Sequence, residues 1–331
     1  MSNSADIILS IQNLKTYFPI KKGVFRKVVG HIKAVDDVSI DIYRGETLGL
    51  VGESGCGKTT LGKTILKLIN PSDGKIYFND KQKKRDILNL NYGEMKDIRK
   101  KLQIVFQDPH SSLNPAYTVF GSLEDPLKIY GIKSKSERRR VIGDLLEAVN
   151  MRREQMDHYP HEFSGGQRQR IGIARALCID PELIVLDEAV SALDVSIQAQ
   201  VLQLLKKIKE ERNLTYIFIT HDLSVVEYVS DRIAVMYIGK IVEITQSEEL
   251  FRNTLHPYTK ALLSAIPVAD LDKKKKRTIL QGDVPNPANP PSGCPFHPRC
   301  PVRKDKCKTD IPELINYGKS NVDHFSACHL L

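Results

Sequence analysis

The sequence predicts an α/β protein with a mostly parallel β-sheet, followed by a small cysteine-rich C-terminal segment. An apolar strand at 46–51 runs directly into a glycine-rich loop and then into a helix. Two further apolar strands, at 183–186 and 216–220, are separated by one apolar helical stripe. Strands that alternate with helices favour a parallel sheet covered on both faces.

Weaker signals complete the predicted order of elements. Residues 7–11 are apolar, and residues 38–42 alternate between apolar and polar, so we expect a short strand and a half-buried antiparallel strand. Apolar residues at helical spacing follow the glycine-rich loop until Asn70-Pro71, where we expect the helix to end. Leucine and charged residues at helical spacing over about 112–161 predict a helical insertion in the α/β core.

Composition is ordinary for a soluble globular protein. The chain has 331 residues, of which 41% are hydrophobic and 27% are charged. No run approaches the roughly 18 apolar residues that span a bilayer, and the N-terminus lacks the features of a secretory signal. We therefore expect a cytosolic protein without a membrane span of its own, so that any membrane partner supplies the spanning helices.

The net charge of +9 does not by itself identify the binding partner. An excess of basic residues suits either nucleic acid or an anionic membrane surface. The basic residues are dispersed, with only short runs at 81–85, 138–140 and 273–277. Such runs are usually solvated faces. We therefore expect no nucleic-acid partner, and a position next to a membrane explains the charge equally well.

A phosphate-binding loop is predicted between the strand at 46–51 and the following helix. Residues 52–59 fit the pattern G-x-x-x-x-G-K-[ST], whose glycines let backbone N–H groups approach phosphate oxygens. Lys58 is expected to reach the β- and γ-phosphates of ATP, and the Thr59 hydroxyl to coordinate Mg²⁺. The predicted nucleotide contacts in this loop are Gly52, Glu53, Ser54, Gly55, Cys56, Gly57, Lys58, Thr59 and Thr60.

Two carboxylates follow the apolar strand at 183–186. A buried parallel strand carries the residues at its C-terminal end to the sheet edge where ligands bind. We expect Asp187 to hold Mg²⁺ and Glu188 to orient and deprotonate the attacking water.

Three further features indicate an ATPase that works as a dimer of two chains. Residues 163–170 place a serine hydroxyl and two glycine N–H groups ahead of a helix, which makes a second anion-binding cap formed by Ser164, Gly165, Gly166 and Gln167. One chain needs only one such cap for one nucleotide, so we expect this cap to cover the γ-phosphate bound by a partner chain. Gln107 is expected to sense Mg²⁺ and the γ-phosphate, and His221 to donate a hydrogen bond to that phosphate.

The order of these motifs resembles the ATP-binding subunits of ABC transporters over about residues 5–265. The resemblance implies a P-loop NTPase core with an N-terminal antiparallel β subdomain and a helical subdomain. It also implies that Asp194 communicates between two ATP sites and that an aromatic residue stacks on adenine. Phe18 is the first choice for that stack and Tyr17 the second.

Four cysteines crowd the end of the chain, with the spacing C-x₅-C-x₆-C-x₂₀-C: Cys294, Cys300, Cys307 and Cys328. In a reducing compartment they are expected to bind metal rather than to form disulfides. The wide spacing favours a [4Fe-4S] cluster over zinc, which usually has closer cysteine pairs. The alternatives are a zinc site that includes His297, His324 or His329, and thiols without a ligand.

The cysteine-rich tail, which we define as residues 269–331, also resembles the C-terminal extension of ATPase subunits from oligopeptide and dipeptide importers. The stretches 107–115, 187–194 and 255–260 share that resemblance. It implies an ATPase at the cytoplasmic face of the membrane that works with a second ABC ATPase subunit, two transmembrane permeases and an extracytoplasmic peptide-binding protein. This chain resembles the second ATPase of the pair, and a homodimer is also possible. Some subunits of this type carry a four-iron cluster in the tail.

Two other functions remain as alternatives. Related importers of nickel or other small solutes share much of the pattern. An ABC ATPase that acts on nucleic acid or the ribosome is disfavoured, because no second cassette and no long coiled coil is visible in the sequence. The predicted domains are a nucleotide-binding domain at 1–268 and the cysteine-rich, iron–sulfur-binding tail at 269–331, which begins with a charged linker at 270–277. Within the first, a helical subdomain spans about 112–161 and a signature helix continues to about 178.

Overall fold

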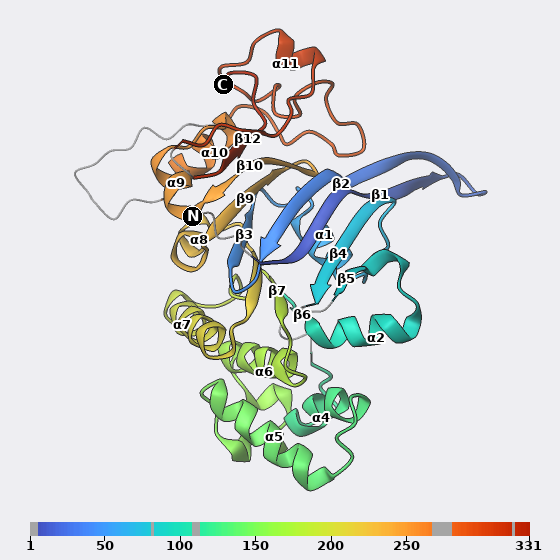
Figure 1. The fold of residues 1–331 in the computed structure, drawn as a ribbon, viewed down its shortest axis with the longest axis vertical. Coiled ribbons are helices and arrows are strands. Elements are labelled where there is room, and N and C mark those ends of the chain that lie inside the picture. The colour runs from blue at the N-terminus through green and yellow to red at the C-terminus, as the bar shows by residue number, and fades with distance from the viewer. Residues whose placement is uncertain (1–5, 81–82, 108–112, 267–279, 320–321) are drawn as a thin grey trace. The chain divides into compact units, whose positions relative to one another are not determined.

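The computed structural model describes residues 6–80, 83–107, 113–266, 280–319 and 322–331. The chain divides into two compact units (Figure 1). Unit 1 combines residues 1–89 with 220–331, and unit 2 is the intervening segment 90–219. The predicted charged linker at 270–277 lies outside the described residues, as does residue 112 at the predicted start of the helical insertion. Within the described ranges, no helix is both long and apolar enough to cross a membrane.

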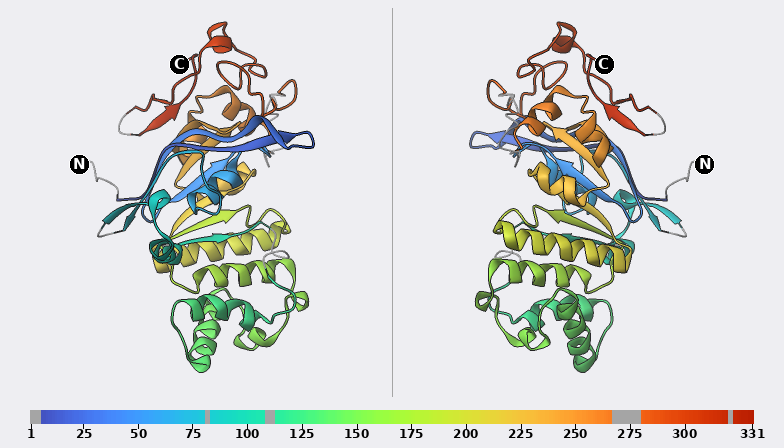
Figure 2. Two further views of the ribbon diagram at one scale, coloured as in Figure 1. Left: turned by 90° about the vertical axis from the view of Figure 1, so that its right-hand side faces the viewer. Right: turned by 90° about the vertical axis from the view of Figure 1, so that its left-hand side faces the viewer.

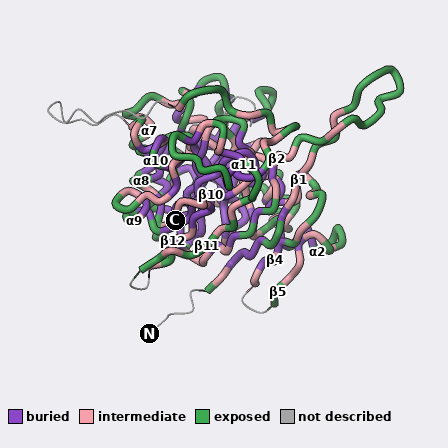
Figure 3. Tube along the Cα trace, turned by 90° about the horizontal axis from the view of Figure 1, so that it is seen from above, coloured by how far each residue is buried: buried purple, intermediate pink, exposed green. Residues whose placement is uncertain are grey.

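Unit 1 begins with an antiparallel sheet in the order β2-β1-β4-β5. Its strands are β1 (Ile7–Lys22), β2 (Lys27–Tyr43), β4 (Asp73–Asp80) and β5 (Lys83–Asp86). Both views of Figure 2 show β1 and β2 as one long two-stranded ribbon. Residues at the tip of this ribbon are exposed, including Val24 and Phe25 (Figure 3).

The prediction for β1 was too short. The predicted strand at 7–11 covers only the first five residues of β1, which continues to Lys22 and also buries Leu14 and Thr16. Beyond Leu14 the side chains show little apolar alternation, but pairing with β2 supplies the backbone hydrogen bonds as far as Lys22. Backbone pairing therefore extends the strand where the hydrophobic pattern gives no signal.

The second sheet of unit 1 holds the start of the phosphate loop. Strand β3 (Thr47–Val51) is parallel to β9 (Arg232–Tyr237), and β9 pairs with the antiparallel strand β10 (Lys240–Gln246). The cysteine-rich tail adds β12 (His324–Ser326) and β11 (Ile315–Asn316) beyond β10. The tail is therefore part of this sheet.

Among the residues that the structure describes, the helices of unit 1 are α1 (Lys58–Ile65), α8 (Leu223–Val229), α9 (Ser247–Arg252), α10 (Pro257–Ser264) and α11 (Lys306–Thr309), with a 3₁₀ turn, η1 (Ile87–Asn89). Helix α1 ends at Ile65, five residues before the predicted end at Asn70. The chain leaves the helix because Lys67 adopts a left-handed conformation, with φ of 51°. Leu68, which extends the helical pattern in the sequence, is exposed.

Unit 2 contains three parallel strands in the order β8-β7-β6. These are β6 (Leu102–Val105), β7 (Leu183–Asp187) and β8 (Thr215–Ile219), and every residue of β7 and β8 is buried. The apolar runs at 183–186 and 216–220 therefore predicted two strands of a parallel sheet correctly.

The helices of unit 2 are α2 (Tyr92–Lys101), α4 (Val119–Ile129), α5 (Lys135–Ala148), α6 (Gly165–Leu177) and α7 (Val195–Arg212), with 3₁₀ turns η2 (Arg153–Asp157) and η3 (Pro160–Glu162). Helices α4 and α5 fall in the region 112–161 that the sequence predicts to be helical. The predicted apolar stripe lies on α7, where its members Val201, Leu204, Leu205 and Ile208 are buried.

Candidate nucleotide-binding site

The predicted phosphate loop joins β3 to α1, in the strand–loop–helix arrangement that the motif requires. Gly57 caps the N-terminus of α1 with φ of 110°, a conformation that residues with a side chain rarely adopt. A Cβ atom at this position would lie 2.0 Å from the carbonyl oxygen of Ala34. Gly57 is therefore required by both backbone conformation and space.

Lys58 is folded back over the loop. Its side chain is 4% exposed, and its Nζ donates hydrogen bonds to the carbonyl oxygens of Gly52 (2.8 Å) and Glu53 (3.0 Å). Its third partner is the sulfur of Cys56, and within the described residues Lys58 forms no ion pair. A buried cation surrounded by neutral acceptors is costly unless an anion joins it. The loop thus has the charge that an incoming phosphate would neutralise.

Other parts of unit 1 hold the loop in place. The backbone N–H of Glu53 donates to the Tyr258 hydroxyl (2.9 Å), and the Arg299 guanidinium binds the Glu53 carboxylate. Burial raises the pKa of the Cys56 thiol, so this side chain stays neutral. Ser54 and Gly55 are exposed at the tip of the loop, and Thr59 and Thr60 are half-buried at the start of α1. The contacts of Tyr258 and Arg299 were not predicted.

The predicted catalytic carboxylates lie in unit 2, at the end of β7. Asp187 is 3% exposed, and Glu188 follows with φ of 48°, a left-handed conformation that is uncommon outside glycine. Gln107 lies just beyond the neighbouring strand β6, and its Nε2 donates to Glu188 Oε2 at 2.7 Å. The sheet register thus brings two of the predicted site residues into contact. Strain and a hydrogen bond together fix the direction of the Glu188 carboxylate.

The predicted anion cap forms the N-terminus of α6. Ser164 is the N-cap: its hydroxyl accepts from the Gln167 N–H (3.3 Å), and Gln167 Oε1 accepts from the Ser164 N–H (3.0 Å). Gly166 is buried, and a Cβ there would lie 2.3 Å from the Ile197 side chain on α7. Close helix packing is therefore a second reason for this glycine, which the sequence analysis missed. Gly165 is half-buried and faces Leu193.

The remaining predicted residues lie at the ends of elements or on the ribbon. His221 is exposed in unit 1, between β8 and α8, and Asp194 is exposed in unit 2 at the N-cap of α7. On β1, the Tyr17 hydroxyl donates to Asp36, whereas the Phe18 ring is 38% exposed. Burial, with the Asp36 hydrogen bond, raises the pKa of Tyr17. Phe18 is thus the less constrained of the two aromatic candidates.

The comparisons with known proteins agree with this set of motifs. A family model described as "ABC transporter" matches residues 35–191, and one for the "Oligopeptide/dipeptide transporter, C-terminal region" matches residues 242–307. The oligopeptide transport ATP-binding protein AppF of Bacillus subtilis is 52% identical to this chain, over 98% of each protein. The chain belongs to the oligopeptide/dipeptide branch of the ABC transporter ATP-binding proteins.

Other relatives of this ABC transporter ATP-binding protein support the same assignment. A probable peptide ABC transporter ATP-binding protein of Sinorhizobium fredii is 46% identical, over 98% of this chain and 90% of that protein. Among solved structures, a dimeric post-hydrolysis state of the ATP-binding cassette MJ0796 bound to ADP and Pi has a TM-score of 0.62. It is 30% identical and covers 72% of this chain and 98% of its own. The ABC ATPase fold predicted from the sequence is confirmed.

Three of the four tail cysteines of this ABC protein belong to one hydrophobic cluster. Cys294, Cys300 and Cys307 are buried, Cys328 is half-buried, and the Cys294 N–H donates to the Cys307 carbonyl (2.9 Å). Burial raises the pKa of Cys294 to about 11, and the negative charge of the other three thiolates adds to the rise. Across the described ranges, however, no three histidine, cysteine or acidic side chains form a group that could hold a metal ion. Four thiols are suitable ligands for an iron–sulfur cluster, but in the described residues they are not arranged around a common metal position.

The three histidines of the zinc alternative have other partners. His324 Nε2 lies 2.8 Å from a carboxylate oxygen of the buried Glu243, His297 Nδ1 lies 3.0 Å from the Cys294 carbonyl, and His329 Nε2 lies 2.9 Å from the Asp310 carbonyl. Each contact uses one ring nitrogen and leaves the other for a metal, but in the part of the chain that the structure describes these histidines join no group of three possible metal ligands.

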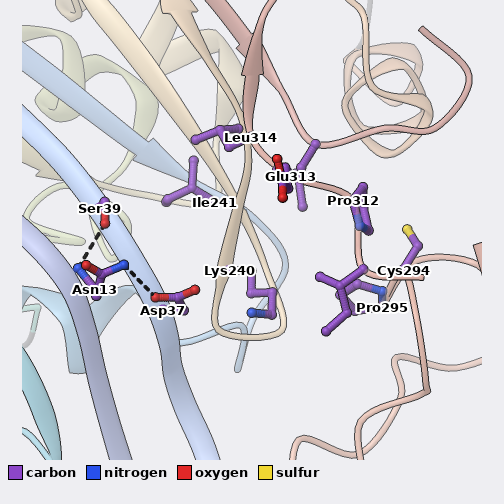
Figure 4. A pocket seen from close by; sticks show the side chains of 13 residues that line it. Asn13, Asp37, Ser39, Lys240, Ile241, Cys294, Pro295, Pro312, Glu313 and Leu314 are labelled. Atoms are coloured by element: carbon purple, nitrogen blue, oxygen red, sulfur yellow. Dashed lines mark hydrogen bonds between the residues drawn. The ribbon is translucent and has the colours of Figure 1, made fainter. Parts of the chain in front are cut away.

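A cavity of about 280 Å³ in unit 1 lies apart from the phosphate loop (Figure 4). It is lined on one side by residues of the β1–β2 ribbon such as Asn13 and Asp37, and on the other by Cys294 and Pro295 of the tail. Asn13 donates hydrogen bonds to Asp37 and, from its backbone, to Ser39. The polar groups of the ribbon side are therefore already paired with each other.

Two of the three loop glycines, Gly57 and Gly55, give a matched test of this geometry. Gly57→Ala is expected to lower the free energy of unfolding by about 3 kcal/mol, because strain and a backbone clash add. Gly55→Ala, at φ of 78° with nothing within 4 Å of the new Cβ, is expected to cost about 1 kcal/mol. Chemical unfolding without nucleotide measures both, and equal costs would contradict the described loop.

Proposed function

We propose that this chain is the ATP-hydrolysing subunit of a peptide importer, in which the phosphate loop binds the phosphates of ATP and the carboxylates at the end of β7 serve hydrolysis. The observation that carries this proposal is the buried Lys58, whose hydrogen bonds all go to neutral acceptors. Family membership supports both the ATPase activity and the peptide cargo, since relatives are named for peptide transport.

The predicted site residues would have different roles. Lys58 and the loop N–H groups would bind the phosphates, and Phe18 would stack on adenine. Thr59, Asp187 and Gln107 would hold Mg²⁺, which neutralises charge that develops on the phosphate oxygens. His221 would donate to the γ-phosphate.

Glu188 is the proposed general base for the attacking water. Its carboxylate accepts a hydrogen bond from Gln107, so the two side chains orient each other before nucleotide arrives. Gln107 lies in the segment that leads towards α4, and movement of Gln107 on binding ATP would therefore be passed to this helical region. We propose that the helical region in turn contacts the permeases.

Hydrolysis would need a second ATPase chain. The cap at Ser164 is built within unit 2 by a reciprocal pair of hydrogen bonds, and it would close over the nucleotide of the partner. We propose a heterodimer with another ABC ATPase, with Asp194 communicating between the two sites. Two transmembrane permeases and an extracytoplasmic peptide-binding protein would complete the importer, with this chain at the cytoplasmic face of the membrane.

Replacing the proposed base tests the ATPase assignment directly. Glu188→Gln keeps the Gln107 contact possible but removes the base, so ATP hydrolysis by the assembled transporter should fall about 10²-fold or more while ATP binding persists. The control is Glu211→Gln, which removes a carboxylate from the exposed end of α7. Turnover by Glu188→Gln equal to that of the control would refute the assignment of the base.

We also propose that the cysteine-rich tail binds a [4Fe-4S] cluster through Cys294, Cys300, Cys307 and Cys328. The support is that the four thiols are buried or half-buried in the tail, together with the cysteine count that such clusters use. A cluster there would supply four strong metal–thiolate links to a segment with little regular structure.

Iron analysis of anaerobically purified protein tests the cluster. We expect about four irons per chain, with visible absorption, and loss of both when Cys294 and Cys307 are changed to serine. Cys178→Ser is the control, because this buried cysteine belongs to unit 2 and is not one of the tail cysteines. A colourless protein that contains zinc or no metal would exclude the cluster and leave the ATPase assignment intact.

A further inference from the structure

We propose that Arg299 of the cysteine-rich tail is a positioning residue for ATP binding. It neutralises Glu53 inside the phosphate loop and so keeps that loop attractive to the phosphates. The inference rests on the ATP site described above and assigns part of that site to the tail.

The contact is a two-point ion pair. The Arg299 guanidinium donates to both carboxylate oxygens of Glu53, with Nη1 2.7 Å from Oε2 and Nη2 3.0 Å from Oε1. The Arg299 side chain is 7% exposed and that of Glu53 is 26% exposed, so water screens the pair only partly. Paired hydrogen bonds of this kind fix geometry as well as charge, and they are among the stronger contacts in proteins.

The segment that carries Arg299 is held against the loop by aromatic packing. Phe296 contacts Tyr237 and Tyr258, with ring centroids 5.3 and 5.4 Å apart. Tyr258 accepts the hydrogen bond from the Glu53 N–H, and Arg299 also donates to the Tyr237 hydroxyl at 3.5 Å. Both the backbone and the side chain of Glu53 are therefore held by this aromatic cluster and the tail.

The negative charge of Glu53 matters for the binding of ATP. Glu53 places a carboxylate one residue after Gly52, in a loop whose N–H groups and Lys58 attract anions. Without a partner, that carboxylate would repel the phosphates of ATP, since like charges at the protein surface interact over several ångströms. Arg299 cancels it, and because a guanidinium stays protonated at all relevant pH values, the cancellation is permanent.

A purely structural role for the pair makes different predictions. If Arg299 only anchors the tail, its loss lowers the stability of the protein, and removing the Glu53 carboxylate as well does not restore ATP affinity. If Arg299 instead neutralises the charge of Glu53, removing the Glu53 carboxylate from the Arg299 variant restores ATP affinity. The double variant therefore separates the two roles.

The test measures the Kd of the full-length chain for Mg-ATP, with a fluorescent ATP analogue as the probe. Arg299→Gln is expected to weaken binding about fivefold at low salt, and the difference should shrink as salt screens the exposed charge. Adding Glu53→Gln to Arg299→Gln should bring the Kd back to within about twofold of wild type. Arg303→Gln, which removes an exposed tail arginine that bonds only the Pro298 carbonyl, is the matched control and should bind as wild type does.

Two results would overturn the proposal. One is that Arg299→Gln binds Mg-ATP as tightly as Arg303→Gln does, and the other is that the double variant binds Mg-ATP as weakly as Arg299→Gln alone.

If Arg299→Gln does not fold, Arg299→Lys keeps the positive charge without the paired hydrogen bonds to Glu53. It should then bind within about twofold of wild type, and weak binding by this folded variant would count against charge masking. Failure of the wild-type chain to bind ATP would instead refute the nucleotide site itself.

Discussion

The burial of Lys58 is the constraint on which the site depends. Its ammonium group lies in a loop of backbone dipoles, where its partners are two carbonyl oxygens and a thiol. A buried cation with only neutral partners is costly, and the negative charge of a bound phosphate would offset that cost. Gly57 is required in this loop for two reasons: its φ is positive, and a Cβ there would lie 2.0 Å from the Ala34 carbonyl oxygen.

Most of the loop's support comes from residues far away in the sequence. Tyr258 and Arg299 both hold Glu53, and Arg299 is separated from it by 246 residues. The tail reaches this position because β12 pairs with β10 and because Phe296, Cys294, Cys300 and Cys307 join the hydrophobic cluster that contains Val51, the last residue of β3. The cysteine-rich tail is therefore a structural part of the nucleotide-binding unit, packed directly behind the phosphate loop.

The features of the fold that depend on a short stretch of sequence could be predicted. The phosphate loop, the buried strands β7 and β8 and the apolar stripe of α7 each have a signal within a few residues, and all are present. The end of α1 and the length of β1 were wrong, because a left-handed Lys67 and pairing with β2 outweigh the hydrophobic pattern. The contacts of Arg299 and the packing of Gly166 on Ile197 could not be predicted, since they depend on elements that meet only in the folded chain.

Titration of the purified chain with Mg-ATP by calorimetry tests the central claim, that Lys58 makes this loop an anion site, most directly. We expect one ATP per wild-type chain, and Lys58→Ala should lose binding by tenfold or more, since a charged hydrogen bond contributes roughly 1.5–3 kcal/mol. Lys63→Ala, on the following helix, is the control and should bind ATP as wild type does. Equal ATP affinity in Lys58→Ala and the control, or no binding by the wild-type chain, would contradict the account.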